Sequence, residues 1–140
     1  MNVEELGKEG ELEARKILKR IGFELTAPDW LGRRGGKWTA FEIKRKERFK
    51  SPPFDGHGLN LWQVERRMDL FRRNNLRTFL MIWEIPSNIW FGQWLDVLED
   101  RGNRNSKTEK HITKNQVVIY PLRNFKLLKK GLKENNSRQI

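Results

Sequence analysis

Two carboxylates and one lysine stand at a spacing that a β-hairpin can bring together. Asp29 follows Pro28, and Glu42 and Lys44 are separated by Ile43. Carboxylate oxygens are the hard ligands that Mg²⁺ prefers, and a lysine beside them can hold a phosphate or help to deprotonate a water. Together these residue types could hydrolyse a phosphodiester bond.

The chain between these residues decides whether they can meet. Gly35-Gly36 predicts a turn, which would place Asp29 and Glu42 across neighbouring strands spaced about 4.8 Å apart. One Mg²⁺ would fit between the two carboxylates. Ile43 would point to the other face and pack into the core, while its backbone carbonyl could serve as a further ligand. Lys44 would return to the face of Glu42 by the strand period of two.

Each of these residues also has an ordinary structural interpretation. An aspartate after a proline is common in turns, and Glu42 and Lys44 could be a solvated, charge-paired strand face. The conjunction favours a functional site, because a Pro-Asp pair, a predicted hairpin and a Glu-x-Lys on an apolar strand occur together in a basic chain.

Three further residues are candidates for the site. Glu11 lies at one edge of the apolar stripe of the first helix and Glu13 at the other, so periodicity alone does not choose between them. Gln63 begins the second helix and could bond a metal-bound water or a carboxylate, or simply face solvent. His57 stands between two glycines in a long loop, where it could contact phosphate, transfer a proton or be an ordinary loop residue.

The charge of the chain indicates a polyanionic partner. The 140 residues include 29 Lys and Arg against 18 Asp and Glu, a formal charge of +11. Nucleic acid is the usual partner of such a surface, although a solvated surface without a partner remains an alternative. The residues that we expect to contact the phosphate backbone, besides His57, are Arg33, Arg34, Arg45, Lys46, Arg48, Lys50, Arg66 and Arg67.

Composition excludes several other classes of protein. The chain has no cysteine, so disulfides and thiolate metal sites are ruled out. No apolar run approaches the roughly 20 residues of a membrane span, and the polar, acidic first residues argue against a signal peptide. We therefore expect a cytoplasmic protein, or one in the host cytoplasm if it is phage-encoded.

Periodicity predicts an α/β fold with a mixed sheet. We expect one domain over residues 1–128 and a basic, flexible tail over residues 129–140. The expected helices are residues 3–21, 59–74 and 95–100; the expected strands are residues 23–27, a segment from 29, 38–44, 78–85, 89–94 and, as the last one, 117–120; residues 45–58 and 101–114 are expected to be irregular.

These motifs resemble the PD-(D/E)xK nuclease superfamily, and within it the archaeal Holliday-junction-resolvase-like and related phage nucleases. Asp29 matches the motif aspartate, and Glu42 and Lys44 match the motif Glu-x-Lys. The helix that precedes Gly22-Phe23 aligns Glu11, not Glu13, with the family's helix glutamate, and Gln63 falls on the following helix, where many members carry a polar residue. The resemblance implies a restriction-endonuclease-like αβββαβ core, dependence on Mg²⁺ or Mn²⁺, and a homodimer.

The predicted function is therefore metal-dependent DNA endonuclease activity, with selectivity for DNA structure, in recombination, repair or phage DNA processing. Glu11, Asp29 and Glu42 would organise the metal, Lys44 would aid the attacking water, and Gln63 would support the site. The alternatives are a restriction-type endonuclease, a non-enzymatic nucleic-acid-binding protein on a nuclease scaffold, and an RNA-directed binder.

Overall fold

A computed structural model describes residues 3–25, 31–104 and 110–130 of the chain. The order of its elements is α1 (Val3–Ile21), β1 (Glu24–Leu25), β2 (Leu31–Arg34), β3 (Lys37–Lys46), β4 (Gly56–Asn60), α2 (Leu61–Asn74), β5 (Arg77–Glu84), β6 (Ile89–Trp94), α3 (Leu95–Arg104), β7 (His111–Ile112), β8 (Val117–Pro121), a short 3-10 helix (Leu122–Asn124) and β9 (Lys126–Lys129).

A mixed six-stranded sheet forms the centre of the fold. Its strand order is β1-β2-β3-β5-β6-β9. Neighbouring strands are antiparallel except β3 and β5, which are parallel and joined through β4 and α2. This arrangement confirms the predicted fold class, a mixed α/β fold with helices against a central sheet.

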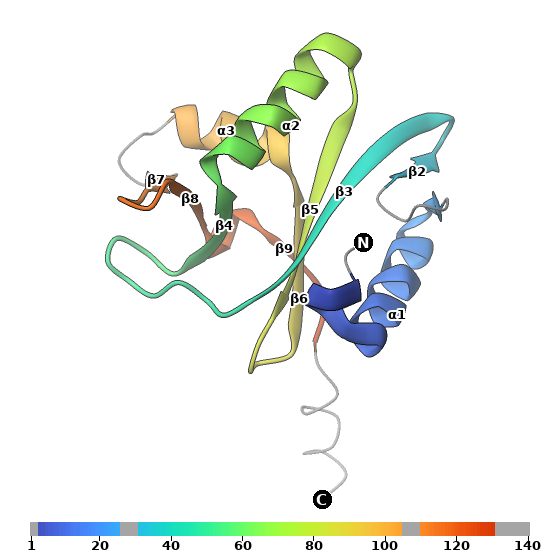
Figure 1. Ribbon diagram of the computed structural model, residues 1–140, viewed down its shortest axis with the longest axis horizontal. Helices are drawn as coiled ribbons and strands as arrows, with labels where there is room; N and C mark the ends of the chain where they lie inside the picture. Colours follow the sequence, from blue (N-terminus) through green and yellow to red (C-terminus); the bar gives the residue numbers. More distant parts are fainter. Residues whose placement is uncertain (1–2, 26–30, 105–109, 131–140) are drawn as a thin grey trace, which may run out of the picture.

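Helices cover both faces of this sheet (Figure 1). Helix α1 lies on one side, and α2 and α3 lie on the other together with the smaller sheet β4-β8-β7. Two separate apolar cores result. The core beneath α1 includes Ala14, Leu18, Phe41 and Met81. The core beneath α2 and α3 includes residues such as Leu80.

The apolar run in β5 is buried on both faces, as we predicted. Phe79 and Met81 face α1, while Leu80 and Ile82 belong to the core on the α2 side. Residues paired across a ladder share a face of the sheet, and the parallel register aligns Glu42 with Leu80. Glu42 therefore lies on the α2 side.

The segment around Gly56-His57-Gly58 is a strand, which corrects the expectation of an irregular stretch reaching Gly58. An added Cβ would lie 2.0 Å from the carbonyl oxygen of Tyr120 at Gly56, and 1.6 Å from that of Val118 at Gly58. These glycines are therefore present because β4 lies too close to β8 for a side chain. Glycine-rich sequence usually indicates a loop, and here it reflects this close approach.

Two expectations about the C-terminal half also need correction. Strand β8 is not the last strand, because β9 follows it and pairs with β6 at the sheet edge. Helix α3 continues to Arg104 and β7 forms at His111–Ile112, so the predicted loop 101–114 is only partly irregular. Strand β9 ends at Lys129, and most of the predicted tail lies outside the described residues. No described helix has the length and apolar character needed to cross a membrane.

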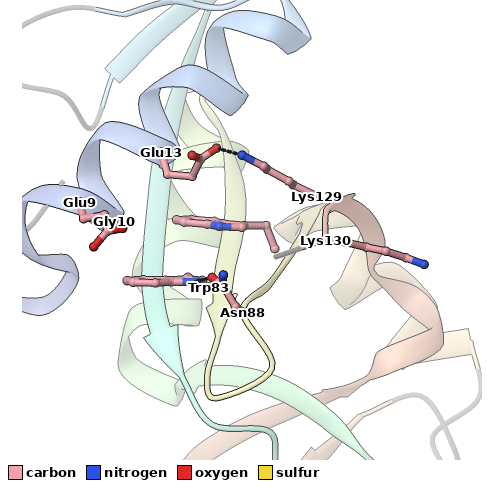
Figure 2. A pocket seen from close by; sticks show the side chains of 8 residues that line it. Glu9, Gly10, Glu13, Trp83, Asn88, Lys129 and Lys130 are labelled. Carbon is pink, nitrogen blue, oxygen red and sulfur yellow. Dashed lines mark hydrogen bonds and ion pairs between the residues drawn. The ribbon is translucent and has the colours of Figure 1, made fainter. Parts of the chain in front are cut away.

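Helix α1 approaches the sheet closely at Gly10 (Figure 2). A Cβ added there would lie 2.6 Å from the indole of Trp83. Trp83 in turn stacks on Trp90, with ring planes 4° apart and centroids separated by 5.4 Å. The absence of a side chain at Gly10 thus lets the helix rest on this stacked pair, which explains why a glycine stands in the apolar stripe of the helix.

Candidate active site

Glu42 and Lys44 lie side by side on β3, as the strand period predicts. The Nζ atom of Lys44 is 3.4 Å from Oε1 of Glu42. Ile43 between them points to the other face and is buried in the α1-side core. The long parallel pairing of β3 with β5 holds this stretch of backbone rigidly, since all of Thr39 to Lys46 takes part in the ladder.

Helix α2 supplies the other neighbours of Glu42. Arg67 donates a hydrogen bond to Oε2 of Glu42 at 2.6 Å, and the Gln63 amide donates one to Oε1 at 3.4 Å. Gln63 and Arg67 are one helical turn apart, so both point from the same face of α2 toward β3. Of the roles that the sequence left open for Gln63, contact with a carboxylate is the one present.

Glu42 opens into a surface cavity of about 420 Å³. Its side chain is 12% exposed and that of Lys44 is 16% exposed, so both are partly shielded yet reachable from solvent. The cavity is lined by Glu42, Trp62, Gln63, Arg66, Arg67 and Leu70. Two arginines against one glutamate make this cavity electropositive, which suits a phosphate-bearing ligand.

The other two predicted metal ligands, Asp29 and Glu11, are not seen beside Glu42 in the described residues. Asp29 lies outside the described residues. Glu11 is on α1, which packs on the opposite face of the sheet from α2 (Figure 1). Over the described ranges, no group of three or more His, Asp or Glu side chains could hold a metal ion. Glu11 and Asp29 as ligands thus stay predictions.

The oxygen atoms near Glu42 can be compared with the ligands that a divalent cation requires. Mg²⁺ takes oxygen ligands in octahedral geometry, and the described residues here offer the Glu42 carboxylate and the Ile43 carbonyl. The carboxylate already accepts a hydrogen bond from Arg67 and lies beside Lys44. These described residues therefore do not form a complete cation site by themselves, and a second carboxylate is needed.

The predicted phosphate-binding residues differ in their contacts and exposure. Some are engaged by other side chains. Arg48 forms two hydrogen bonds to Glu84, and Arg45 lies over the Trp83 ring on the α1 side. Arg34 lies over Phe23. The exposed members of the predicted set are Arg33, Arg34, Arg45, Lys46, Lys50 and Arg66. Among them, Arg33 also pairs with Glu24.

His57 is fully buried, so the expectation of an exposed loop histidine is wrong. Its Nε2 lies 2.7 Å from Oε2 of Glu84. Burial lowers the pKa of His57 more than the carboxylate raises it, so the neutral ring donates from Nε2. In this arrangement His57 joins β4 to the end of β5 and cannot reach a nucleic acid.

Glu84 is the centre of this buried cluster. It accepts hydrogen bonds from Arg48, His57 and Ser87. Burial raises the pKa of the Glu84 carboxyl, but these bonds and the charge of Arg48 outweigh burial and hold the pKa at about 2. The sequence carried a signal for this cluster, because a lone acid inside an apolar strand must find partners.

Comparisons with known proteins add a structural likeness. No family model and no curated protein matches the sequence. The fold is similar to that of Hjc, a Holliday junction resolvase from the archaeal hyperthermophile Archaeoglobus fulgidus. The TM-score is 0.49 and the sequence identity 14%, covering 81% of this chain and 88% of that chain.

Proposed function

We propose that this protein is a metal-dependent nuclease that hydrolyses phosphodiester bonds in DNA, with Glu42 and Lys44 in its active site. One observation carries the proposal. A Glu-x-Lys pair lies on a rigid strand with both side chains directed toward α2, and Glu42 lines an electropositive cavity. A site that only stabilised the fold would not need to leave this carboxylate accessible from solvent.

Lys44 has the position that a catalytic lysine needs. Its ammonium lies 3.4 Å from the Glu42 carboxylate, close enough for both groups to contact the same water or phosphate oxygen. There it would orient an attacking water and stabilise the negative charge that develops on the phosphate. Gln63 would hold Glu42 in place through its amide, and Arg66 and Arg67 would bind neighbouring phosphates.

The divalent ion is part of this proposal. Asp29, Glu42 and the Ile43 carbonyl would hold Mg²⁺ or Mn²⁺, and the bound ion would act as a Lewis acid on the phosphate. We further propose that the substrate is branched or end-containing DNA, as in recombination, repair or phage DNA processing, and that the protein acts as a homodimer.

A cleavage panel tests the proposal. Linear duplex, single strand, flap, splayed arm and four-way junction are incubated with wild-type protein and Mg²⁺, and product is measured on denaturing gels. Asp29→Asn and Glu42→Gln should bind DNA but release no product. Glu65→Gln is the matched control for Glu42→Gln, because Glu65 is an exposed glutamate on α2. Full cleavage by Glu42→Gln would overturn the assignment.

A second candidate is a non-enzymatic DNA-binding protein on the same scaffold. The contacts that favour it are those of Arg67 and Lys44 with Glu42, which already neutralise the carboxylate. This candidate predicts that labelled DNA is retained in a gel shift, while no product forms with Mg²⁺ or Mn²⁺ on any substrate of the panel.

A further inference from the structure

An exposed tryptophan lies beyond the active-site cavity on the same strand. Trp38 is 50% exposed and stands four residues before Glu42 on β3. Alternation places Trp38, Ala40 and Glu42 on one face, and the usual rise of a strand separates the Cα atoms of Trp38 and Glu42 by about 13 Å. Ala40 between them is fully buried, so other side chains cover the strand between these two positions.

One stripe of side chains on helix α2 spans the distance between these two positions. Residues 62, 66, 70 and 74 are spaced by four and form one stripe along the helix. Trp62, Arg66 and Leu70 line the Glu42 cavity, while Asn74 lines a second cavity of about 460 Å³ that also includes Trp38. The two cavities thus adjoin the same stripe, about 18 Å from end to end. Trp62 at one end is 59% exposed.

Cations surround Trp38. Arg33 is its partner across the β2–β3 ladder, and the guanidinium lies over the indole ring, 5.5 Å from its centroid. Arg33 also pairs with Glu24, but both side chains are at least half exposed, so this pair is weak. Lys37 and Arg34 line the same cavity. The indole therefore stands among groups that attract phosphates.

The floor of the second cavity is rigid. Arg77 lies 4.0 Å from the centroid of the Trp94 ring and donates two hydrogen bonds of 3.0 Å to Asp96. Both Arg77 and Trp94 line the cavity. Part of the cavity wall is therefore preformed, which lowers the entropic cost of binding a ligand in the cavity.

We propose that this second cavity is a subsite for unpaired nucleotides of single-stranded DNA, in which one base stacks on Trp38 and the flanking phosphates contact Arg33 and Lys37. The inference rests on the proposed function, since it extends the path of the DNA away from Glu42. A base inside a duplex offers no free face for stacking, whereas an unpaired base can stack on an aromatic ring.

Binding measurements without metal test this subsite. Fluorescent oligothymidine and an abasic oligomer of equal length are titrated in EDTA with wild-type protein, Trp38→Ala, Trp38→Phe and Leu12→Ala. Loss of stacking should weaken oligothymidine binding by Trp38→Ala about 5- to 150-fold, with Trp38→Phe close to wild type. Leu12→Ala, an exposed apolar residue on α1, should bind like wild type.

The abasic oligomer separates stacking from charge. It keeps the phosphates and loses the bases, so wild type and Trp38→Ala should bind it equally. Unchanged oligothymidine binding by Trp38→Ala, or an equal loss on both oligomers, would overturn the subsite. Failure of the nuclease proposal has a different signature, because no substrate would then be cleaved while the dependence of binding on Trp38 persisted.

Discussion

Replacing Glu84 with glutamine should destabilise the protein in a manner that depends on pH. Glu84 is buried and accepts hydrogen bonds from Arg48, His57 and Ser87. Glutamine keeps the size of the side chain and resembles the protonated acid. The substitution therefore removes the charge without leaving a cavity, and it isolates the electrostatic contribution of this cluster.

The magnitude follows from the pKa of Glu84. The cluster holds that pKa at about 2, against an ordinary value of 4.5. A difference of about 2.5 units at 1.36 kcal/mol per unit corresponds to about 3 kcal/mol of folding free energy. Because the pKa of Glu84 is lower in the folded protein than in the unfolded chain, the ionised carboxylate stabilises the folded protein above pH 4.5. This stabilisation is lost as the pH falls toward 2.

Urea denaturation at several pH values measures this effect. The difference in free energy of unfolding between wild type and Glu84→Gln should be about 3 kcal/mol near neutral pH, and should shrink steadily below pH 4.5. Glu47→Gln is the control, since Glu47 is an exposed carboxylate close to the same cluster in the chain. A difference that stayed constant down to about pH 3 would refute the electrostatic reasoning.

Three other substitutions give distinct expectations. Gly58→Ala should prevent folding or cost more than about 4 kcal/mol, as measured by thermal unfolding, because its Cβ would lie 1.6 Å from a β8 carbonyl oxygen. Gly10→Ala should destabilise by about 1 kcal/mol although alanine favours helix, because of the contact with Trp83; a gain in stability would contradict this packing. Arg66→Gln should reduce the salt dependence of DNA binding by about one in log–log slope, and an unchanged slope would remove Arg66 from the interface.

Much of the fold could be predicted from the sequence because its local signals agree with its tertiary structure. The apolar run in β5 indicated a strand covered on both faces, and both cores contain its residues. The alternation in β3 placed Glu42 and Lys44 together and Ile43 in the core. The period of two along a strand determines which side chains share a face, whatever the neighbouring strands are.

The parts that could not be predicted depend on contacts between distant segments. The glycines beside His57 indicated a loop, whereas the approach of β8 to β4 requires them in a strand. The burial of His57 then follows from its pairing with Glu84, 27 residues away. Arg48 was expected on the surface as a phosphate ligand, and its engagement by the same glutamate follows from this long-range fold.

The residue types of the candidate site could be predicted from the sequence, but the side chains that contact Glu42 could be predicted only in part. Glu42 and Lys44 lie together as expected, and Gln63 contacts Glu42, one of the roles left open for it. Arg67, 2.6 Å from the carboxylate, was expected only as a phosphate ligand. The exposure of Trp38 was not predicted, because a tryptophan in an apolar strand usually belongs to a core.

The single-turnover rate of Mg²⁺-dependent DNA cleavage by Lys44→Met tests whether Lys44 acts in catalysis. Lys16→Met, at an exposed position of α1, is the matched control, and DNA binding by both variants is measured in EDTA. Lys44→Met should bind DNA but cleave it at least about a hundredfold more slowly than wild type, while Lys16→Met should match wild type. Equal cleavage by wild type and both variants would contradict an active site at Glu42 and Lys44.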